Sequence, residues 1–338
     1  MTGRIGYIDA LKGIAMIMVV CGHLILFCGL GDENEFIRHI VLVNMPLFFC
    51  LNGLVVSYKP VGIIAYGRKL LNLFVPFFCW GGLISLYRSA SYVDFLIQMY
   101  HFGYWYLLVL VELKVAFYVF YVICKKAGRY SNIVTDSLLI LSVAFIVRYS
   151  GKFLPEGVAL TGGYWFFNDY FIYFFFGALI KKYGLLEKIY DYRDQVMAVT
   201  TVLLIPFYVL WSRDVLNDLL VRFFVLDFIV WLVCLMSIIY HTESDQGKTR
   251  TNWLCRIGEN TLVIYMAQFF LFRCIHLDNV YAALYGSGNN FALLLITVAI
   301  AIAICYFCMG IGYVVRQSRI LSFLLLGQEI RIKKICRV

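Results

Sequence analysis

Long apolar runs, separated by short polar connections, follow one another along almost the whole chain. A run of about 17 to 25 apolar residues is long enough to cross a lipid bilayer as an α-helix. Ten runs reach or approach this length, so the pattern predicts an all-α bundle of about ten membrane-spanning helices. The predicted spans are Leu11 to Cys28, Ile37 to Ser57, Leu70 to Tyr87, Gly103 to Cys124, Ile133 to Tyr149, Tyr164 to Ile180, Val196 to Trp211, Leu219 to Tyr240, Thr261 to His276 and Phe291 to Val314.

The basic residues of the connections predict how this bundle is oriented. Cytoplasmic loops of membrane proteins are enriched in Lys and Arg. Successive connections here alternate between many and few such residues, which predicts that both termini are cytoplasmic and agrees with an even number of spans. The rich connections include Arg4, Lys59, Arg68, Lys125, Lys181, Arg193, Lys248 and Arg316, and the poor ones hold only Arg38, Arg88, Lys152 and Arg213.

Composition excludes an ordinary soluble domain. Hydrophobic residues make up 62% of the 338 residues and charged residues only 14%, whereas soluble domains contain about 25% charged residues. The net charge of +9 then follows from the basic loops and does not indicate a nucleic-acid partner. No connection is long enough for a separate soluble domain. We therefore expect one membrane domain over residues 1–338, whose basic tail, residues 315–338, lies at the membrane interface.

The eleven cysteines and five histidines do not form a recognisable framework. Most cysteines lie in apolar runs, where Cys acts as a small hydrophobic residue. Cys305-x-x-Cys308 has redox spacing but lies in an apolar helix, which favours packing. The histidine spacing does not suggest a metal site, and we expect no bound cofactor. Candidate chemistry therefore has to come from polar residues inside the spans.

Three ionisable residues interrupt the first span, namely Asp9, Lys12 and His23. Such groups are costly in lipid unless they are paired or hydrated. Asp9 and Lys12 are three residues apart, which predicts a local ion pair. Lys12 and His23 are eleven residues apart, which puts them on nearly the same helix face, about 16 Å apart along the axis. His23 either hydrogen-bonds a neighbouring helix or serves as a general base.

This first span resembles the opening signature of the acyltransferase-3 family of integral-membrane O-acyltransferases. The signature is a basic residue, ten intervening residues and a histidine, in a first span preceded by an aspartate. Here it reads Lys12-x10-His23 after Asp9. Family members often have Arg at the basic position, and Lys keeps the charge but lacks the bidentate fork of a guanidinium. The resemblance implies that His23 is catalytic and that Lys12, oriented by Asp9, contacts the acyl donor.

The second predicted span extends the resemblance. Its run from Asn44 through Pro46 to Asn52 resembles the family's apolar-Pro-Leu-Phe-Phe element that ends in Ser-Gly, with Asn52 in place of Ser. Pro46 is expected to kink the helix and to free backbone groups near Asn44. Both Asn side chains either line the substrate site or join helices through hydrogen bonds.

The third and fourth spans add basic, aromatic and acidic candidates. Arg68 and Lys69 begin a basic-then-Pro element like that of the family, and they could bind donor phosphates, although the positive-inside rule alone would place them there. Trp105 begins a triplet that resembles the family's Trp-Phe-Leu. Glu112 and Lys114 lie deeper in the same span and about 200° apart on the helix. They predict an interior helix, with Glu112 as a candidate partner of His23.

Two late motifs complete the resemblance. A phenylalanine-rich run that ends at Gly177 resembles a Phe-Leu-Gly element, and its glycine allows close helix contact. The stretch from Gly258 to Gln268 resembles Gly-x-x-Ser-Leu-x-Ile-Tyr-x-x-His, with Thr261 for Ser and Gln268 for His. Gln268 cannot titrate but can still form hydrogen bonds, so we expect it to line the site.

Other charged residues within the spans lie mostly near their outer ends. They could bind a sugar or phosphate group of an acceptor, or they could pair with one another, and the sequence gives no pairing. These residues are Arg148, Asp169, Arg222, Asp227 and Arg273.

The resemblance covers the chain from Arg4 to about Val314 and implies a membrane O-acyltransferase. Such a protein is multi-pass, lies in the inner or plasma membrane of a bacterium, and uses cytosolic acyl-CoA, most often acetyl-CoA. It modifies a hydroxyl of an envelope polysaccharide or lipid-linked glycan, directly or through an acyl relay. Membrane lipid is a partner, and a homo-oligomer or a separate extracytoplasmic partner stays open. A glycan transporter or flippase and a polysaccharide polymerase are the competing interpretations.

Overall fold

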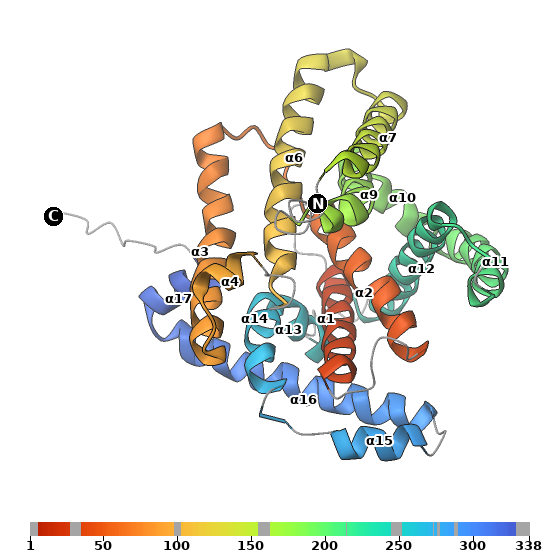
Figure 1. Cartoon of the computed structure of the whole chain (residues 1–338). Helices are drawn as coiled ribbons and strands as arrows, with labels where there is room; N and C mark the ends of the chain where they lie inside the picture. The colour runs from red at the N-terminus through yellow and green to blue at the C-terminus, as the bar shows by residue number, and fades with distance from the viewer. Residues whose placement is uncertain are drawn as a thin grey trace.

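The described part of the chain is built from α-helices and short 3-10 turns, as the apolar pattern predicts. The computed structural model describes residues 6–27, 35–97, 103–154, 163–213, 215–244, 252–272, 274–275, 278–286 and 290–328. No β-strand occurs within these ranges. Figure 1 follows the chain from the first helix in red to the last in blue. The all-α prediction is confirmed.

All ten predicted spans are helical. Within the described residues, seven helices are long and apolar enough to cross a membrane, and two shorter apolar helices, Leu42–Leu54 and Thr261–Phe272, accompany them. The number of spans and the side on which each terminus lies stay predictions. The ten helices are α1 (Gly6–Phe27), α2 (Glu35–Leu54), α3 (Ile63–Arg88), α6 (Trp105–Ala127), α7 (Ile133–Ser150), α9 (Tyr164–Lys182), α11 (Arg193–Ser212), α12 (Asp218–Ser244), α14 (Thr261–Phe272) and α16 (Asn290–Arg316).

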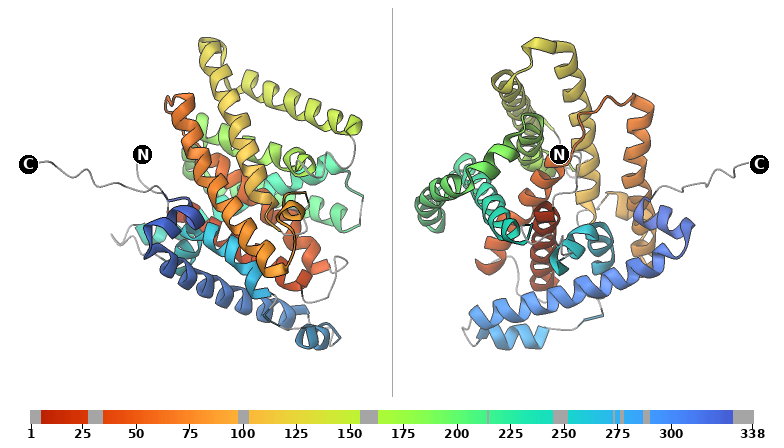
Figure 2. Two further views of the ribbon diagram at one scale, coloured as in Figure 1. Left: turned by 60° about the vertical axis from the view of Figure 1, so that its left-hand side comes forward. Right: turned by 180° about the vertical axis from the view of Figure 1, so that it is seen from behind.

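Short helices, most of which the apolar pattern does not reveal, connect these spans. They are α4 (Tyr92–Ile97), α10 (Leu185–Asp191), α13 (Trp253–Glu259), α15 (Asp278–Gly286) and α17 (Arg319–Leu326), with 3-10 turns at Gly128–Tyr130 and Gly151–Phe153. Figure 2 shows α16 running across one end of the bundle, where it contacts α1 and α14.

The C-terminal helix α17 is packed on the bundle through α3. The indole Nε1 of Trp80 donates a hydrogen bond to the Leu325 carbonyl oxygen over 2.8 Å. Gly327 ends the helix in a left-handed conformation with φ of 62°, and its Cα lies so close to the Asn72 backbone that no side chain fits there. The predicted interfacial segment therefore begins as a docked helix. Its basic end, residues 329–338, lies outside the described residues.

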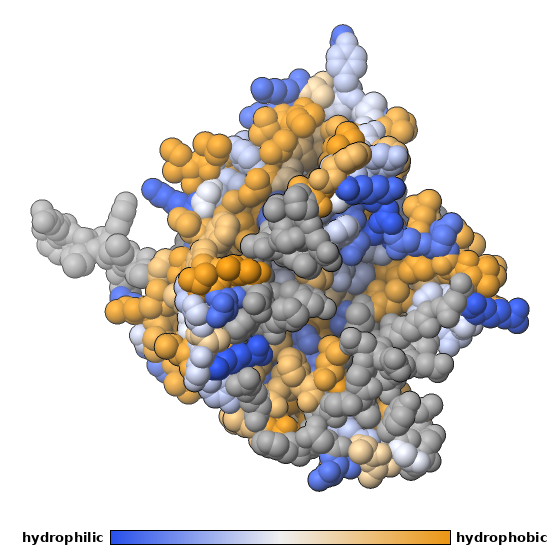
Figure 3. All heavy atoms as spheres, in the orientation of Figure 1, coloured by the Kyte–Doolittle hydropathy of each residue, from blue (hydrophilic) through white to orange (hydrophobic). Residues whose placement is uncertain are grey.

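Apolar side chains form much of the outer surface. Figure 3 shows them in orange over much of the visible face. They include Phe145 on α7, Val202 on α11 and Val314 on α16, each exposed by more than 60%. Large apolar surfaces of this kind are typical of helices that face lipid, so the exposed surface agrees with the predicted membrane bundle.

Helix α1 lies at the centre of the fold. In its apolar window 67% of the residues are buried, more than in any of the other six long apolar helices of the described chain. It packs against α13, where a glycine of each helix contacts the backbone of the other helix. A Cβ on Gly258 would lie 1.8 Å from the Asp9 carbonyl oxygen, and one on Gly13 would lie 2.2 Å from that of Leu254. Only glycine permits such an approach, which is common between membrane helices.

A second pair of glycines joins α2 to α9. A Cβ on Gly53 would lie 1.9 Å from the Phe174 carbonyl oxygen, and one on Gly177 would lie 2.1 Å from that of Cys50. The prediction that Gly177 permits close helix contact is therefore confirmed. The two helices that bear the second and sixth predicted spans pack backbone against backbone.

Most charged residues near the helix ends are paired with one another. Arg222 binds the Asp169 carboxylate over 2.8 Å, and Arg148 binds Asp218, so these pairs tie α7 and α9 to α12. Of the two alternatives for the outer charges, the structure shows internal ion pairs at three of the five positions. Asp227 Oδ2 is buried without a hydrogen-bond partner among the described residues, and Arg273 lies outside those residues.

At the opposite end of α7, Lys182 binds Asp136, which also accepts a hydrogen bond from Tyr183 over 2.6 Å. This pair ties the first turn of α7 to the last residue of α9. The first turn of α7 and the end of α9 thus lie at the same face of the bundle. That relation agrees with the alternation of spans in the predicted topology.

Gly177→Ala is expected to lower the melting temperature of the purified protein. The added carbon would lie 2.1 Å from the Cys50 carbonyl oxygen, so α9 must move away from α2, and overpacking of this kind costs about 1–3 kcal/mol. The measurement is thermal unfolding in detergent. Gly310→Ala in α16 is the matched control, because nothing lies within 4 Å of its added carbon. Equal melting temperatures for the two variants would contradict the contact.

Candidate functional site

A cavity of about 240 Å³ runs along α1 and is bounded by α2, α3, α6, α13 and α14. We call it the α1 cavity. Asp9 and Lys12 line one end. The remaining wall is mixed, with apolar residues such as Met16 and Val19 beside polar ones such as Glu259. The lining residues are Asp9, Lys12, Met16, Val19, Met45, Phe48, Asn52, Leu73, Tyr106, Leu107, Leu110, Gly258, Glu259, Thr261, Leu262 and Tyr265.

The ion pair predicted in the first span is present at this end of the cavity. Lys12 Nζ lies 3.6 Å from Asp9 Oδ1. The Asp9 side chain is buried, while that of Lys12 keeps 21% exposure. A carboxylate that partly neutralises the amine lowers the cost of holding the amine inside the bundle. Lys12 is thereby held at the cavity wall with its amine still accessible.

The lining residues of α1 form a single stripe that points toward His23. Asp9, Lys12, Met16 and Val19 follow one another at intervals of three and four, which is the spacing of one helix face. His23 comes four residues after Val19 and is the next position on that face. It lies about 16 Å beyond Lys12 along the helix axis. The cavity therefore follows this face from Asp9 to Val19, while His23 is not among the described residues that line it.

Helix α14 has a matching stripe on the opposite wall. Thr261, Leu262 and Tyr265 line the cavity, and Gln268 follows Tyr265 by three residues on the same face. The Gln268 carboxamide interacts with the His23 side chain. The two stripes thus converge, and two polar residues predicted from separate motifs meet at their end.

His23 lies in a largely aromatic setting. Its ring centroid is 5.0 Å from that of Phe269, 6.0 Å from that of Phe272 and 6.3 Å from that of Phe27. The Gln268 side chain donates to the Tyr265 carbonyl oxygen over 3.2 Å. Within the described residues, His23 Nδ1 and Gln268 Oε1 are both buried without a hydrogen-bond partner. The structure therefore leaves hydrogen-bonding capacity unused beside the His23 ring.

Asn52 belongs to the site, whereas Asn44 packs elsewhere. The amide of Asn52 donates to the Tyr106 hydroxyl and to the Phe48 carbonyl oxygen, each over 2.9 Å, and its side chain lines the α1 cavity. The buried Asn44 accepts a hydrogen bond from the Met45 backbone and is not among the described residues that line this cavity. Asn52 therefore combines the two roles that the sequence left open.

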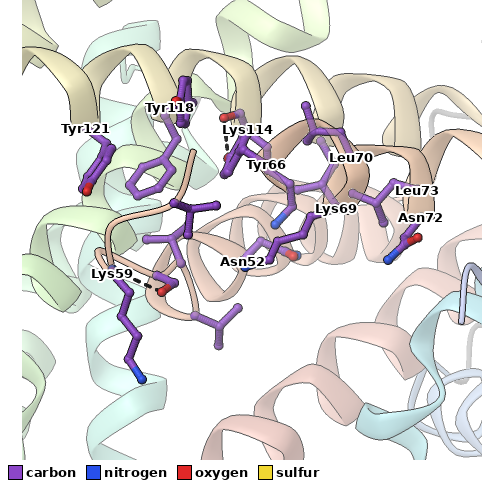
Figure 4. Close-up of a pocket in the computed structure, with 16 residues that line it drawn as sticks. Asn52, Lys59, Tyr66, Lys69, Leu70, Asn72, Leu73, Lys114, Tyr118 and Tyr121 are labelled. Atoms are coloured by element: carbon purple, nitrogen blue, oxygen red, sulfur yellow. Dashed lines mark hydrogen bonds between the residues drawn. The ribbon is translucent and has the colours of Figure 1, made fainter. Parts of the chain in front are cut away.

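A second cavity, of about 350 Å³, adjoins the first and shares Asn52, Leu73 and Leu110 with it. We call it the lysine cavity. Figure 4 shows its wall, with Lys69 and Lys114 facing it and Tyr66 and Tyr118 beside Lys114. Its lining is Asn52, Val55, Val56, Ser57, Lys59, Val61, Tyr66, Lys69, Leu70, Asn72, Leu73, Leu110, Lys114, Phe117, Tyr118 and Tyr121.

Three further candidates lie away from both cavities. Arg68 is exposed and is not among the described lining residues, although its neighbour Lys69 is. Trp105 stacks on Phe166 with ring centroids 4.1 Å apart, which is a packing role. Glu112 is half-buried and likewise absent from the described linings of both cavities, while Gln268 is the polar side chain beside His23.

Sequence analysis missed two residues that line the α1 cavity, Tyr106 and Tyr265. It noted Lys114 as a charge inside the fourth span that predicts an interior helix beside a polar cavity, and Lys114 does line the lysine cavity. Tyr106 and Tyr265 stand inside motifs that drew attention to their neighbours, and Lys114 lies two residues from Glu112. The motifs around them were visible in the sequence. To decide which of two adjacent residues faces a cavity, however, one must know how each helix is rotated about its axis. No group of three His, Cys, Asp or Glu side chains in the described chain is arranged to hold a metal.

Comparisons with known proteins agree with the motifs. A model of the acyltransferase-3 family, described as an acyltransferase domain, matches residues 5–310. The nodulation protein NolL of Sinorhizobium fredii is 28% identical over 95 residues, which cover 26% of this chain and 26% of that protein. The match therefore spans about a quarter of the length of that curated relative. No solved structure matches the chain.

Proposed function

This chain belongs to the acyltransferase-3 family, and we propose that it transfers an acyl group from cytosolic acyl-CoA to a hydroxyl of a cell-envelope polysaccharide or lipid-linked glycan. Acetyl is our first choice of acyl group. Family membership and the apolar helices support a multi-pass membrane acyltransferase. The donor, the acceptor and a bacterial inner or plasma membrane belong to the proposal.

The observation that supports this function best is the cavity that follows α1 from Lys12 to Val19, the residue one turn before His23. A donor with an anionic head and a long, thin arm can place its head near the lysine end and its thioester near His23. The apolar middle of the cavity, with Met16, Val19 and Leu107 in its wall, suits such an arm. Positioning of this kind supplies a large part of the rate enhancement in group transfer.

The reaction we propose needs one base. His23 takes the proton of the acceptor hydroxyl as the hydroxyl oxygen attacks the thioester carbonyl carbon. The carbon–sulfur bond then breaks, and the proton on His23 passes to the departing thiolate, which leaves an ester and free CoA. Lys12 lies about 16 Å away along the helix, so its charge acts on the donor's other end and not on the developing oxyanion.

The acceptor is expected to reach His23 from the side opposite Lys12. His23 is half-buried and Phe27, one turn further along α1, is 46% exposed. The donor cavity approaches from the Lys12 end. Two substrates that enter from opposite ends can meet at one imidazole while each keeps its own binding surface, which favours direct transfer.

His23→Ala is expected to reduce acyl transfer by about 10²–10⁴-fold, because a general base is lost, while the protein still inserts. The measurement is mass spectrometry of envelope glycan, with and without base treatment, from a strain that lacks the gene. A base-labile mass increment should vanish on deletion and return with wild type but not with His23→Ala. Loss of the whole glycan in the deletion strain would instead favour transport or polymerisation.

Lys12→Ala is expected to raise the KM for acyl-CoA roughly tenfold, the loss of one contact to a charged group, and to leave the KM for the acceptor near its wild-type value. Lys12→Arg, which keeps the charge, should retain most of the donor affinity. The measurement is steady-state thioester consumption at varied donor and acceptor. A larger effect on the acceptor KM than on the donor KM would contradict the proposed orientation of the cavity.

Gln268→Leu is expected to lower kcat about tenfold with little change in either KM, because the polar group beside His23, whose Oε1 has no other partner among the described residues, is lost. Gln268→His should recover much of the rate, since an imidazole can also hydrogen-bond the ring of His23. Both variants are compared in the same steady-state assay after their melting temperatures have been matched to wild type. A Gln268→Leu enzyme with wild-type kcat would show that Gln268 only fills space.

A further inference from the structure

We propose that the lysine cavity binds the nucleotide end of the acyl donor, with Lys69 and Lys114 on its phosphates and the tyrosines against its adenine. This proposal rests on the proposed function and makes it more specific. It assigns the phosphates nearest the adenine to Lys69 and Lys114 in place of Arg68. Lys12, which lines the α1 cavity, keeps the contact to the end of the anionic head that adjoins the pantetheine arm.

The first argument is the concentration of positive charge. Lys114 is close enough to Lys12 and Lys69 for both charges to repel it. No Asp or Glu is among the described residues that line the lysine cavity, although Lys59, Lys69 and Lys114 all line it. Lys114 is half-buried, while Lys59 and Lys69 are exposed. Positive charges that line one cavity favour the binding of an anion there. A ligand with several phosphates supplies that anion in a single molecule.

The second argument is the aromatic wall beside these amines. The rings of Tyr66 and Tyr118 are stacked, with centroids 4.6 Å apart, and Tyr121 lies 6.3 Å from Tyr118. The Tyr66 hydroxyl donates to the Lys114 carbonyl oxygen over 2.7 Å, which fixes the ring beside that lysine. Aromatic faces next to cations are the usual means of holding a base together with its phosphates.

The third argument is the order of the chemical groups. The two cavities share Asn52, Leu73 and Leu110, so one extended ligand can occupy both. Aromatic residues and amines line the lysine cavity, and Met16 and Val19 line the α1 cavity beyond them. His23 follows Val19 on the same face of α1, just beyond the described lining. Coenzyme A thioesters present adenine, phosphates, a thin arm and a thioester in the same order. A lipid headgroup has phosphate but lacks both the base and the thioester arm.

The predicted topology agrees with entry of a soluble donor. Lys59 and Lys69 belong to a connection that the positive-inside rule assigns to the cytoplasm. In Figure 4, Lys59 extends away from the other lysines, so we assign the phosphate contacts to Lys69 and Lys114. A cytosolic thioester would meet these two amines before its arm enters the α1 cavity.

The test uses the full-length protein in nanodiscs of neutral lipid, with acetyl-CoA, acetyl-3′-dephospho-CoA and S-acetylpantetheine as donors. For wild type, we expect the donor KM to rise roughly tenfold with loss of the 3′-phosphate and further without the nucleotide. Lys114→Gln and Lys69→Gln should raise the KM for acetyl-CoA without changing that for S-acetylpantetheine. Lys126→Gln, an exposed lysine further along α6, is the matched control and should behave as wild type.

A binding measurement gives a second readout that does not depend on turnover. Adenosine 3′,5′-bisphosphate should raise the melting temperature of wild type and of Lys126→Gln, and it should have a smaller effect on Lys114→Gln and Tyr118→Ala. The same measurement in nanodiscs with anionic lipid separates the two phosphate sources. If anionic lipid abolishes the shift and the nucleotide does not compete back, the cavity binds headgroups and the proposal is wrong.

Failure of this proposal differs from failure of the proposed function. If the enzyme transfers acetyl groups but Lys114→Gln and Lys69→Gln keep the wild-type preference for acetyl-CoA over S-acetylpantetheine, the nucleotide site is wrong and the acyltransferase stands. If no donor is consumed with any acceptor but the bisphosphate still binds through Lys114, the function is wrong and the nucleotide site stands. Absence of both consumption and binding would overturn the two together.

Discussion

The backbone contact between α1 and α13 is the constraint on which the site depends. Gly13 and Gly258 bring the two helices so close that any side chain at either position would overlap a carbonyl oxygen. Helix α14 follows α13 after Asn260, so the same contact sets the rotation of α14. That rotation turns Thr261 and Tyr265 toward α1 and carries Gln268 to His23. The motif from Gly258 to Gln268 therefore contains one residue, Gly258, that serves helix packing.

The cost of charge in a bilayer explains where the lysines lie. An isolated amine surrounded by lipid is costly, and the structure lowers that cost in two ways. Lys12 is partly neutralised by Asp9, 3.6 Å away, whereas Lys69 and Lys114 face a cavity large enough to admit water or a ligand. Near the outer ends of the helices, Arg148 and Arg222 are each paired with a carboxylate. Lys12, Lys69 and Lys114 thus place positive charge at the two cavities.

Much of this structure could be predicted from the sequence, because the relevant signals are local. Apolar runs gave the ten helices, a three-residue spacing gave the Asp9–Lys12 pair, and a glycine in an aromatic run gave the contact at Gly177. The choice of Lys69 over Arg68 could not be made, because neighbours on a helix point about 100° apart and a sequence does not fix rotation. The meeting of His23 with Gln268 was also inaccessible, since it depends on how α13 is seated.

Under the proposed function, the distance between the lysines and His23 matches an elongated donor. Phosphates that moved deeper along α1 would leave Lys69 and Lys114 for a wall that includes Met16, Val19 and Leu107, and transfer of charge toward apolar side chains is unfavourable. The proposed donor would therefore be held by its head at one end, and the length of its arm would decide how far its thioester reaches. In that case the reach of the donor, and not the thickness of the membrane, explains why His23 lies eleven residues after Lys12.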